Sequence, residues 1–180
     1  EAAVKEVVAD YQKKAAAANK AASPLDDKTA PNIVYVMSES FSDPNRLKGV
    51  DISGDPLKDY YEVADKTYSG QMLSQNYGGG TANIEFEALT GFSMELFNPQ
   101  MTTPYTLLVP KLKQLPSLVS LLKDQGYDTT AIHPYDTSMY KRKDVYQVLG
   151  FDEFLDQDTM KHTEKLENNP YISDESAYEE

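Results

Sequence analysis

The stretch from Ser117 to Leu155 constrains the fold more than any other part of this chain, because helical and strand patterns alternate along it. Each helical pattern ends at a glycine and a strand pattern follows. The helical patterns cover residues 117–125 and 139–149, and the strand patterns cover residues 127–133 and 151–155. Alternating helices and strands are typical of a parallel sheet with helices on its faces. We therefore predict an α/β fold, a mainly parallel sheet flanked by helices.

The remaining segments extend this pattern toward the N-terminus. Residues 32–37 form an apolar, β-branched run bounded by Pro31, which is typical of a buried central strand. Residues 67–77 alternate loosely and predict a second strand, and residues 101–115 look irregular because they contain prolines. Further helices are predicted over residues 1–20, 56–64 and 81–90, and another begins near residues 172–175.

Composition excludes several classes of protein. The chain has 17 Lys and Arg against 29 Asp and Glu, a net charge of −12 that argues against nucleic-acid binding and against an anionic membrane surface. It has no cysteine, which excludes disulfides and thiolate metal sites. Its apolar runs are far shorter than the roughly 20 residues that a membrane-spanning helix needs. With His133 and His162 as the only histidines, a site with several histidine ligands is hard to build.

Glu39 is the first candidate for chemistry, because it follows the predicted strand 32–37. In open α/β sheets, ligands gather beyond the carboxyl ends of the strands. A carboxylate held there is a natural ligand for a hard divalent cation. The alternative is an ordinary polar residue after a strand.

The second candidate is the glycine turn Gly78–Gly80, which leads into Thr81 and a predicted helix. Glycines let the backbone approach an anion, and a helix N-terminus offers free N–H groups. A threonine hydroxyl at that position could act as a nucleophile, or it could simply cap the helix. Glu85 and Glu87, further along, would orient loops or face solvent.

The third candidate is His133, at the end of a predicted strand, with Tyr140 and Arg142 early in the following helix. Histidine and arginine donate charge-assisted hydrogen bonds to phosphoryl oxygens, and the planar fork of arginine suits them well. The alternative is a histidine that ends a strand and an arginine exposed on a helix face.

These three motifs, in this order, resemble the lipoteichoic acid synthase-like phosphoglycerol transferases of the sulfatase/alkaline phosphatase superfamily. The resemblance rests on residues 31–43 (PNIVYVMSESFSD), residues 78–91 (GGGTANIEFEALTG) and residues 126–152, which include His133-Pro134-Tyr135. It implies a catalytic domain over residues 26–180, preceded by a helical linker or docking segment over residues 1–25.

The resemblance also implies a role for each candidate. Glu39 would bind a divalent metal, most commonly manganese, with magnesium or zinc as alternatives. Thr81, also close to the metal, would be the nucleophile that takes glycerol phosphate from a phosphatidylglycerol-like lipid. His133 and Arg142 would contact the glycerol-phosphate group, as would Tyr140, which stands where relatives carry Trp. A glycan or polymer would accept the group at the extracellular face of a bacterial membrane, where the parent protein is anchored.

One departure from the family leads us to expect a piece of a longer protein. The family completes its metal site with an Asp-His pair from the C-terminal half of the domain, and no such pair occurs in this sequence. We therefore expect an incomplete metal site, a chain that is inactive alone, and a sheet exposed enough to support a dimer. A phosphodiesterase, a sulfatase-type hydrolase and a non-catalytic module that binds anionic glycans or lipids stay as alternatives.

Overall fold

A computed structural model describes residues 2–21, 30–75 and 79–180, which fall in two compact units divided after Val36. The first unit contains helix α1 (Ala2–Ala21), which confirms the helix predicted over residues 1–20. Asp10 and Lys14, four residues apart on this helix, form an ion pair with 2.7 Å between Oδ2 and Nζ. Among the described residues no helix is both long and apolar enough to cross a membrane.

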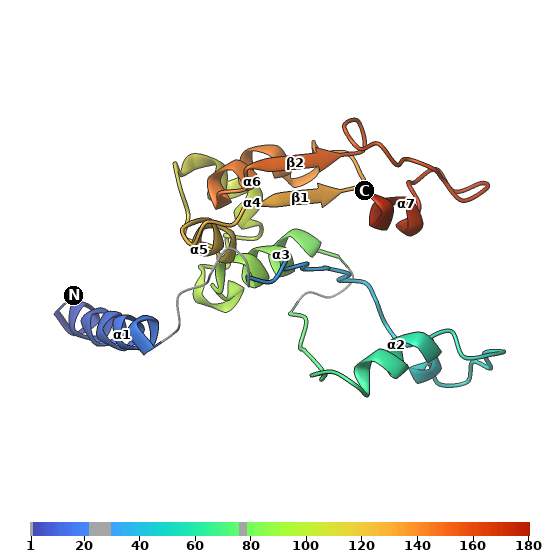
Figure 1. Ribbon diagram of the computed structural model, residues 1–180, viewed down its shortest axis with the longest axis horizontal. Helices are drawn as coiled ribbons and strands as arrows, with labels where there is room; N and C mark the ends of the chain where they lie inside the picture. The colour runs from blue at the N-terminus through green and yellow to red at the C-terminus, as the bar shows by residue number, and fades with distance from the viewer. Residues whose placement is uncertain (1, 22–29, 76–78) are drawn as a thin grey trace. The chain divides into compact units, whose positions relative to one another are not determined.

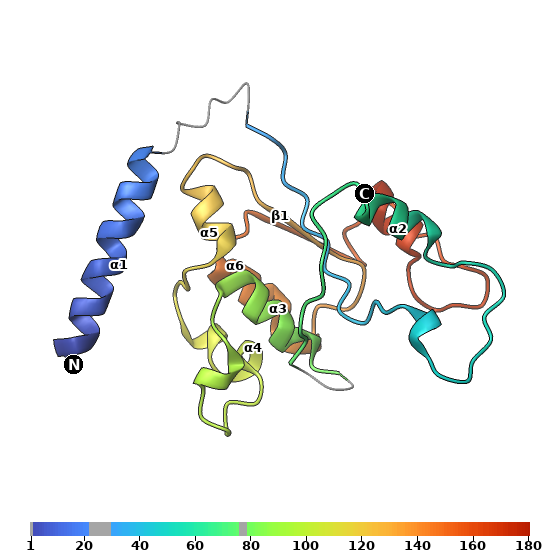
Figure 2. The ribbon, with the colours of Figure 1, turned by 90° about the horizontal axis from the view of Figure 1, so that it is seen from below.

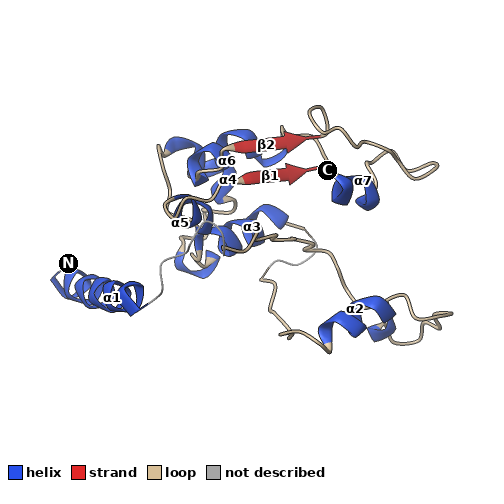
Figure 3. Ribbon diagram, in the orientation of Figure 1, coloured by secondary structure: helices blue, strands red, loops and turns tan. Residues whose placement is uncertain are grey.

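The sheet lies in the second unit and consists of two parallel strands, β1 (Thr130–His133) and β2 (Glu153–Asp156) (Figures 1 and 3). Helix α6 (Arg142–Leu149) lies between them in the sequence, as the helix–strand alternation predicts. Tyr146 of α6 packs on Phe154 of β2, with ring centroids 4.7 Å apart, so this helix covers one face of the sheet. The parallel α/β architecture predicted from the sequence is confirmed.

Glycines and a serine cap set the helix ends in this part of the chain. Helix α5 (Leu118–Lys123) begins with a capping box, in which Ser117 and Ser120 each accept a hydrogen bond from the other's backbone N–H. The Ser117 hydroxyl also donates to the carbonyl of Leu149, at 2.6 Å, which ties the start of α5 to the end of α6. Gly150 then ends α6 with a φ of 103°, a conformation that favours glycine.

Helix α3 (Thr81–Thr90) has the predicted bounds. Gly80 precedes it in the left-handed region, and Gly91, also left-handed, ends it by donating its N–H to the carbonyl of Glu87. Helix α4 (Pro104–Leu107) packs beside α3 (Figure 2). Residues 101–115, predicted to be irregular, thus contain α4 and the 3₁₀ turn Val109–Lys111, because proline is favoured in the first turn of a helix.

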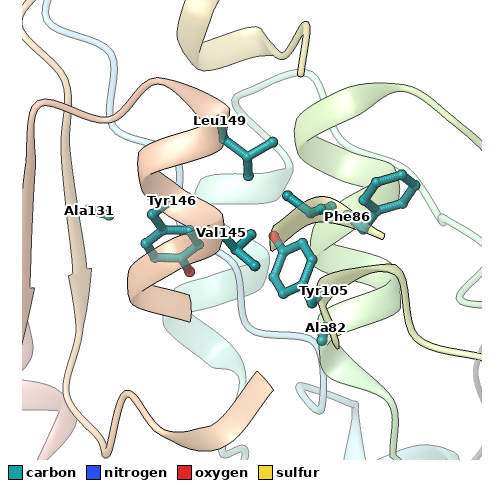
Figure 4. Close-up of a cluster of buried hydrophobic side chains, with 8 residues drawn as sticks. Ala82, Phe86, Tyr105, Ala131, Val145, Tyr146 and Leu149 are labelled. Carbon is teal, nitrogen blue, oxygen red and sulfur yellow. The ribbon is translucent and has the colours of Figure 1, made fainter. Parts of the chain in front are cut away.

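A buried cluster of apolar side chains joins α3, α4, α6 and β1 (Figure 4). Its members are Ala82, Phe86, Tyr105, Val109, Ala131, Val145, Tyr146 and Leu149. Packing of this kind excludes water and resists displacement of the helices, so the shared core fixes the places of α3, α4 and α6.

The other helices are short. They are α2 (Lys58–Ala64), α7 (Asp174–Glu179) and the 3₁₀ turns Pro44–Arg46, Met94–Leu96 and Met139–Lys141. Both α2 and α7 lie where the sequence predicts helices. The side chain of Ser173 caps α7 by accepting from the N–H of Ser176.

Two predicted strands are wrong. Residues 32–37 are irregular, and Val34 is 84% exposed rather than buried. Residues 67–75 are also irregular, with Met72 86% exposed, and the last two residues of that predicted strand lie outside the described residues. A strand needs a hydrogen-bonded neighbour, and neither segment pairs with another strand among the residues that the structure describes.

Candidate functional site

Thr81 is the first residue of α3, where backbone N–H groups lack partners within the helix. The chain reaches it through Gly79 and Gly80, with φ of 134° and 79°, both in the region that favours glycine. Gly78, the first glycine of the predicted turn, lies outside the described residues. The turn and the helix together place the Thr81 hydroxyl at an N-terminus that attracts anions.

Glu39 meets Thr81 at this point, although 42 positions separate them in the sequence. The Thr81 hydroxyl donates a hydrogen bond to Oε2 of Glu39, at 3.0 Å. Both residues are partly buried, and Ser40 donates to the same carboxylate oxygen at 3.3 Å. The structure therefore brings together the two residues that the sequence singled out as candidate metal ligands.

The side chains of Glu39 and Thr81 are suitable ligands for a divalent cation, but two ligands are too few for a complete site. A carboxylate and a hydroxyl are the oxygen ligands that hard cations prefer. Among the described residues, however, there is no group of three or more Asp, Glu, His or Cys side chains able to hold a metal ion. Glu39 and Thr81 could form one side of a metal site, and further ligands would have to come from elsewhere.

Arg142, the predicted phosphate contact, is buried and lies in a cluster centred on Glu85 of α3. Arg142 is 3% exposed and Glu85 is 6% exposed. Nε and Nη2 of Arg142 both donate to Oε2 of Glu85, at 3.2 and 3.0 Å. The hydroxyls of Tyr105, at 3.0 Å, and Tyr146 donate to the other oxygen, Oε1. This cluster was not anticipated, since Glu85 was expected to orient a loop or to face solvent.

The electrostatics of the cluster keep the two tyrosines neutral beside the Arg142–Glu85 ion pair. Burial raises the pKa of the Tyr105 and Tyr146 hydroxyls, and the nearby Glu85 carboxylate raises it further. For Arg142, burial alone would lower the pKa, but the attraction of Glu85 outweighs it and the pKa is raised. The tyrosines therefore act as hydrogen-bond donors to the carboxylate.

Helix geometry relates this cluster to Thr81. Glu85 is four residues after Thr81, and residues at this spacing lie on the same face of a helix, roughly 5–6 Å apart at Cβ. The buried cluster is thus one helical turn from the threonine hydroxyl. The sequence did carry a signal for Glu85, because the apolar residues Ala82 and Leu89, three and four positions away, share its face of the helix.

His133 is the last residue of β1 and pairs in register with Asp156 of β2. Its Nε2 is buried and has no hydrogen-bond partner among the described residues. Burial lowers the pKa of His133 to about 4; the positive charge of Arg142 adds to this effect and Asp156 opposes it. The imidazole is therefore neutral at pH 7, with one ring nitrogen free to bond to a ligand.

Tyr140 adjoins Arg142 through an unusual backbone turn. Its φ is 59°, and that of the following Lys141 is 55°, a region that non-glycine residues rarely occupy. The turn brings the Tyr140 ring to 5.3 Å from Cζ of Arg142, close enough for a cation–π contact. Backbone strain of this kind clusters at functional sites. Tyr140, Arg142 and His133 thus gather near the carboxyl end of β1.

An open pocket of about 340 Å³ lies beyond the same ends of the strands. Pro134 and Tyr135 line it after β1, Gln157 and Asp158 line it after β2, and the segment that carries Tyr171 closes one side. The ring of Tyr135 is 6.3 Å from that of His133, so the pocket adjoins the histidine. A ligand held near His133 therefore has room to extend along this edge.

Comparison with known proteins gives consistent matches. The model of the sulfatase family matches residues 31–180. A protein of Rhizobium meliloti (strain 1021), provisionally named a cyclic beta-1,2-glucan modification protein, is 38% identical over 150 residues, which are 83% of this chain and 22% of that protein.

Two solved structures are similar. The phosphoglycerol transferase GacH of Streptococcus pyogenes, in complex with sn-glycerol-1-phosphate, matches with a TM-score of 0.80 and 31% identity, over 98% of this chain and 46% of that one. The lipoteichoic acid synthase LtaP of Listeria monocytogenes matches with a TM-score of 0.50 and 27% identity, over 62% of this chain and 25% of that one. The chain thus spans less than half of GacH and under a quarter of the Rhizobium relative.

Proposed function

Because the chain belongs to the sulfatase family, we propose that it carries the nucleophile and part of the metal site of a phosphotransferase. The enzyme would move glycerol phosphate from a phospholipid to a glycan or polymer of the cell envelope. One observation carries the proposal: the Thr81 hydroxyl, at the N-terminus of α3, donates to the Glu39 carboxylate. The similarity to GacH, a phosphoglycerol transferase in complex with sn-glycerol-1-phosphate, supports this choice of substrate.

In the first step, Oγ1 of Thr81 attacks the phosphorus of a phosphatidylglycerol-like lipid. The bond from phosphorus to the diacylglycerol oxygen breaks, and diacylglycerol leaves with a proton while glycerol phosphate stays on Thr81. In the second step, a hydroxyl of the acceptor attacks the same phosphorus. The bond to Thr81 breaks, and the threonine hydroxyl is restored. Glu39 orients the Thr81 hydroxyl before attack through their hydrogen bond.

Glu39 and Thr81 would hold a divalent cation, for which we propose Mn²⁺, with Mg²⁺ or Zn²⁺ as alternatives. Such an ion, when bound, supplies Lewis-acid polarisation of the phosphoryl group and favours the deprotonated hydroxyl. The N–H groups at the start of α3 add partial positive charge where the phosphoryl oxygens would lie.

We assign contacts to the glycerol-phosphate group to His133, Arg142 and Tyr140. Arg142 would donate to a phosphoryl oxygen, and the neutral His133 would donate or accept through its unpartnered Nε2. Tyr140 would pack against the glycerol moiety beside Arg142. We propose that catalysis takes place at the extracellular face of the membrane, where lipid donor and envelope acceptor are both available.

The proposal is tested with Thr81→Ala in the full-length protein, with Thr81→Ser as the matched control that keeps a hydroxyl. We expect Thr81→Ala to lower turnover of the lipid donor by about 10³-fold or more, the scale of losing a nucleophile. Thr81→Ser should keep measurable activity, and mass spectrometry of quenched enzyme should find glycerol phosphate on residue 81 only when a hydroxyl is present. Unchanged turnover in a folded Thr81→Ala protein would refute the mechanism.

Transfer and hydrolysis differ in their products. A transferase yields glycerol phosphate on the glycan or polymer, whereas a phosphodiesterase releases it to water, so product analysis with and without acceptor separates them. A sulfatase-type hydrolase is disfavoured, because sulfatases need a cysteine or serine matured to formylglycine, and this chain has no cysteine and has threonine at position 81.

A further inference from the structure

Glu85 binds four hydrogen-bond donors from two helices. Tyr105 of α4 and Tyr146 of α6 donate to Oε1, while Arg142 of α6 donates twice to Oε2. A carboxylate accepts in about four lone-pair directions, so Glu85 is fully satisfied by these groups. Glu85 therefore has no acceptor position left for a ligand, and its role is to hold the neighbouring side chains in place.

Arg142, in contrast, keeps one donor unused. Its Nε and Nη2 bind Glu85, but its Nη1 is buried and has no partner among the described residues. A buried donor on a charged group is costly to leave unpaired. Because the Arg142 side chain is only 4% exposed, this unpaired donor is most simply explained by a ligand that the chain itself does not supply.

The position of the cluster identifies that ligand by its chemistry. Glu85 is one helical turn from Thr81 on the same face of α3, and the unpartnered Nε2 of His133 belongs to the same region through its electrostatic interaction with Arg142. A donor bound to a carboxylate one helical turn from the proposed nucleophile is suited to meet the oxygens of the phosphoryl group under attack.

We propose that Glu85 is a positioning residue that fixes the guanidinium of Arg142 so that Nη1 donates to a phosphoryl oxygen of the donor lipid. This inference rests on the proposed function. Two bonds to one carboxylate oxygen hold Nε and Nη2, and Tyr105 and Tyr146 hold that carboxylate from its other side. The remaining edge of the fork is thereby set in direction before any substrate arrives.

The charge balance sharpens the inference. The Glu85 carboxylate compensates the positive charge of Arg142, so the pair attracts a phosphate mainly through a directed hydrogen bond and little through net charge. Lysine at position 142 would keep the charge but lack the fork that binds Glu85 and the phosphate together. Affinity for the phosphate should therefore depend on the geometry of residues 85 and 142 jointly.

The test uses sn-glycerol-1-phosphate as the probe and calorimetric titration of the full-length protein. The proteins compared are the wild type, Glu85→Gln, Arg142→Lys and the double variant. We expect each single change to weaken binding about tenfold or more, and Glu85→Gln to add less than about twofold when Arg142 is already Lys, as for two coupled neighbours. Val145→Ala is the matched control, because it removes buried contacts on the same helix without touching Glu85.

Each outcome decides between the explanations. Equal weakening by Glu85→Gln and Val145→Ala, at equal loss of thermal stability, would mean that Glu85 only supports the fold and would overturn the inference. Wild-type affinity in Glu85→Gln, with binding still lost in Arg142→Lys, would overturn the positioning role and leave the proposed function standing. Probe binding that Arg142→Lys leaves unchanged would overturn both. If Glu85→Gln does not fold, Glu85→Asp is used instead, because it keeps the carboxylate but shortens the side chain by one methylene. The inference then requires that Glu85→Asp weakens binding of the probe.

Discussion

Helix α3 and the apolar run at residues 33–36 look equally suited to burial in the sequence, but the structure treats them in opposite ways. Phe86 of α3 is 1% exposed, whereas Val34 is 84% exposed. The helix satisfies its own backbone hydrogen bonds and has glycines at both ends, so it needs no paired neighbour to be a regular element. The apolar run has the residues of a strand but no paired neighbour among the described residues. An apolar pattern indicates that burial of these side chains would be favourable. A strand is buried only where a neighbouring strand pairs with it.

The largest effect is expected when a side chain is removed from the buried cluster that contains Phe86. Phe86→Ala should lower the free energy of unfolding by about 3–5 kcal/mol, because a buried aromatic ring is lost and a cavity is left. Chemical denaturation of the chain, followed by circular dichroism, measures the change. A loss below about 1 kcal/mol would mean that the α3 cluster is not a packed core.

The next effect concerns the link between α5 and α6. Ser117→Ala should lower the free energy of unfolding by about 1–2 kcal/mol, since the helix cap and the hydrogen bond to the Leu149 carbonyl are both lost. Ser138→Ala is a matched control, because the side chain of Ser138 makes no capping bond to its 3₁₀ turn. Equal losses in the two variants would contradict the role given to the Ser117 cap.

A pH-dependent effect is expected at His133. Its pKa is about 4 in the folded chain and near 6.5 in the unfolded chain, so between these values only the unfolded chain takes up the proton. The free energy of unfolding should therefore fall as the pH drops from 6.5 toward 4, and His133→Gln should flatten that slope. Denaturation at several pH values measures it, with His162→Gln as the control for losing a histidine. An identical slope in wild type and His133→Gln would show that His133 is not buried as described.

The smallest effect lies in the exposed apolar run. Val34→Ser should change the free energy of unfolding by less than about 0.5 kcal/mol, because the side chain is already in water. The same denaturation measurement applies. A loss of 1 kcal/mol or more would mean that this run finds a partner in solution and would remove the contrast with Phe86.

Sequence patterns predicted the elements that local chemistry specifies. The bounds of α3 follow from a glycine on either side, and α5 follows from the helical pattern over residues 117–125, which ends at Gly126. The two strands of the observed sheet follow from their alternation with helices. The strands predicted at 32–37 and 67–77 failed because pairing depends on residues distant in the sequence, which a local pattern does not contain.

The candidate site divides in the same way. Positions next to predicted elements singled out the candidates Glu39, Thr81, His133, Tyr140 and Arg142. In the structure, the first two of these form a hydrogen bond. Their roles in substrate or metal binding stay predictions. Glu85 was underestimated because a glutamate in a helix faces solvent in most cases, and its burial appears only once α4 and α6 pack against α3.

By itself, the sequence determined where helix α3 begins and ends, that strands alternate with helices, and which residue types are available for phosphoryl chemistry. These properties depend on neighbours within a few positions, where capping, glycine conformation and side-chain period act. Only the tertiary structure decided that Glu39 reaches Thr81 across 42 positions, and that Glu85 binds Arg142 across 57. A hydrogen bond between distant residues depends on how the elements pack, and buried charges such as Arg142 persist only where packing also supplies a counter-charge.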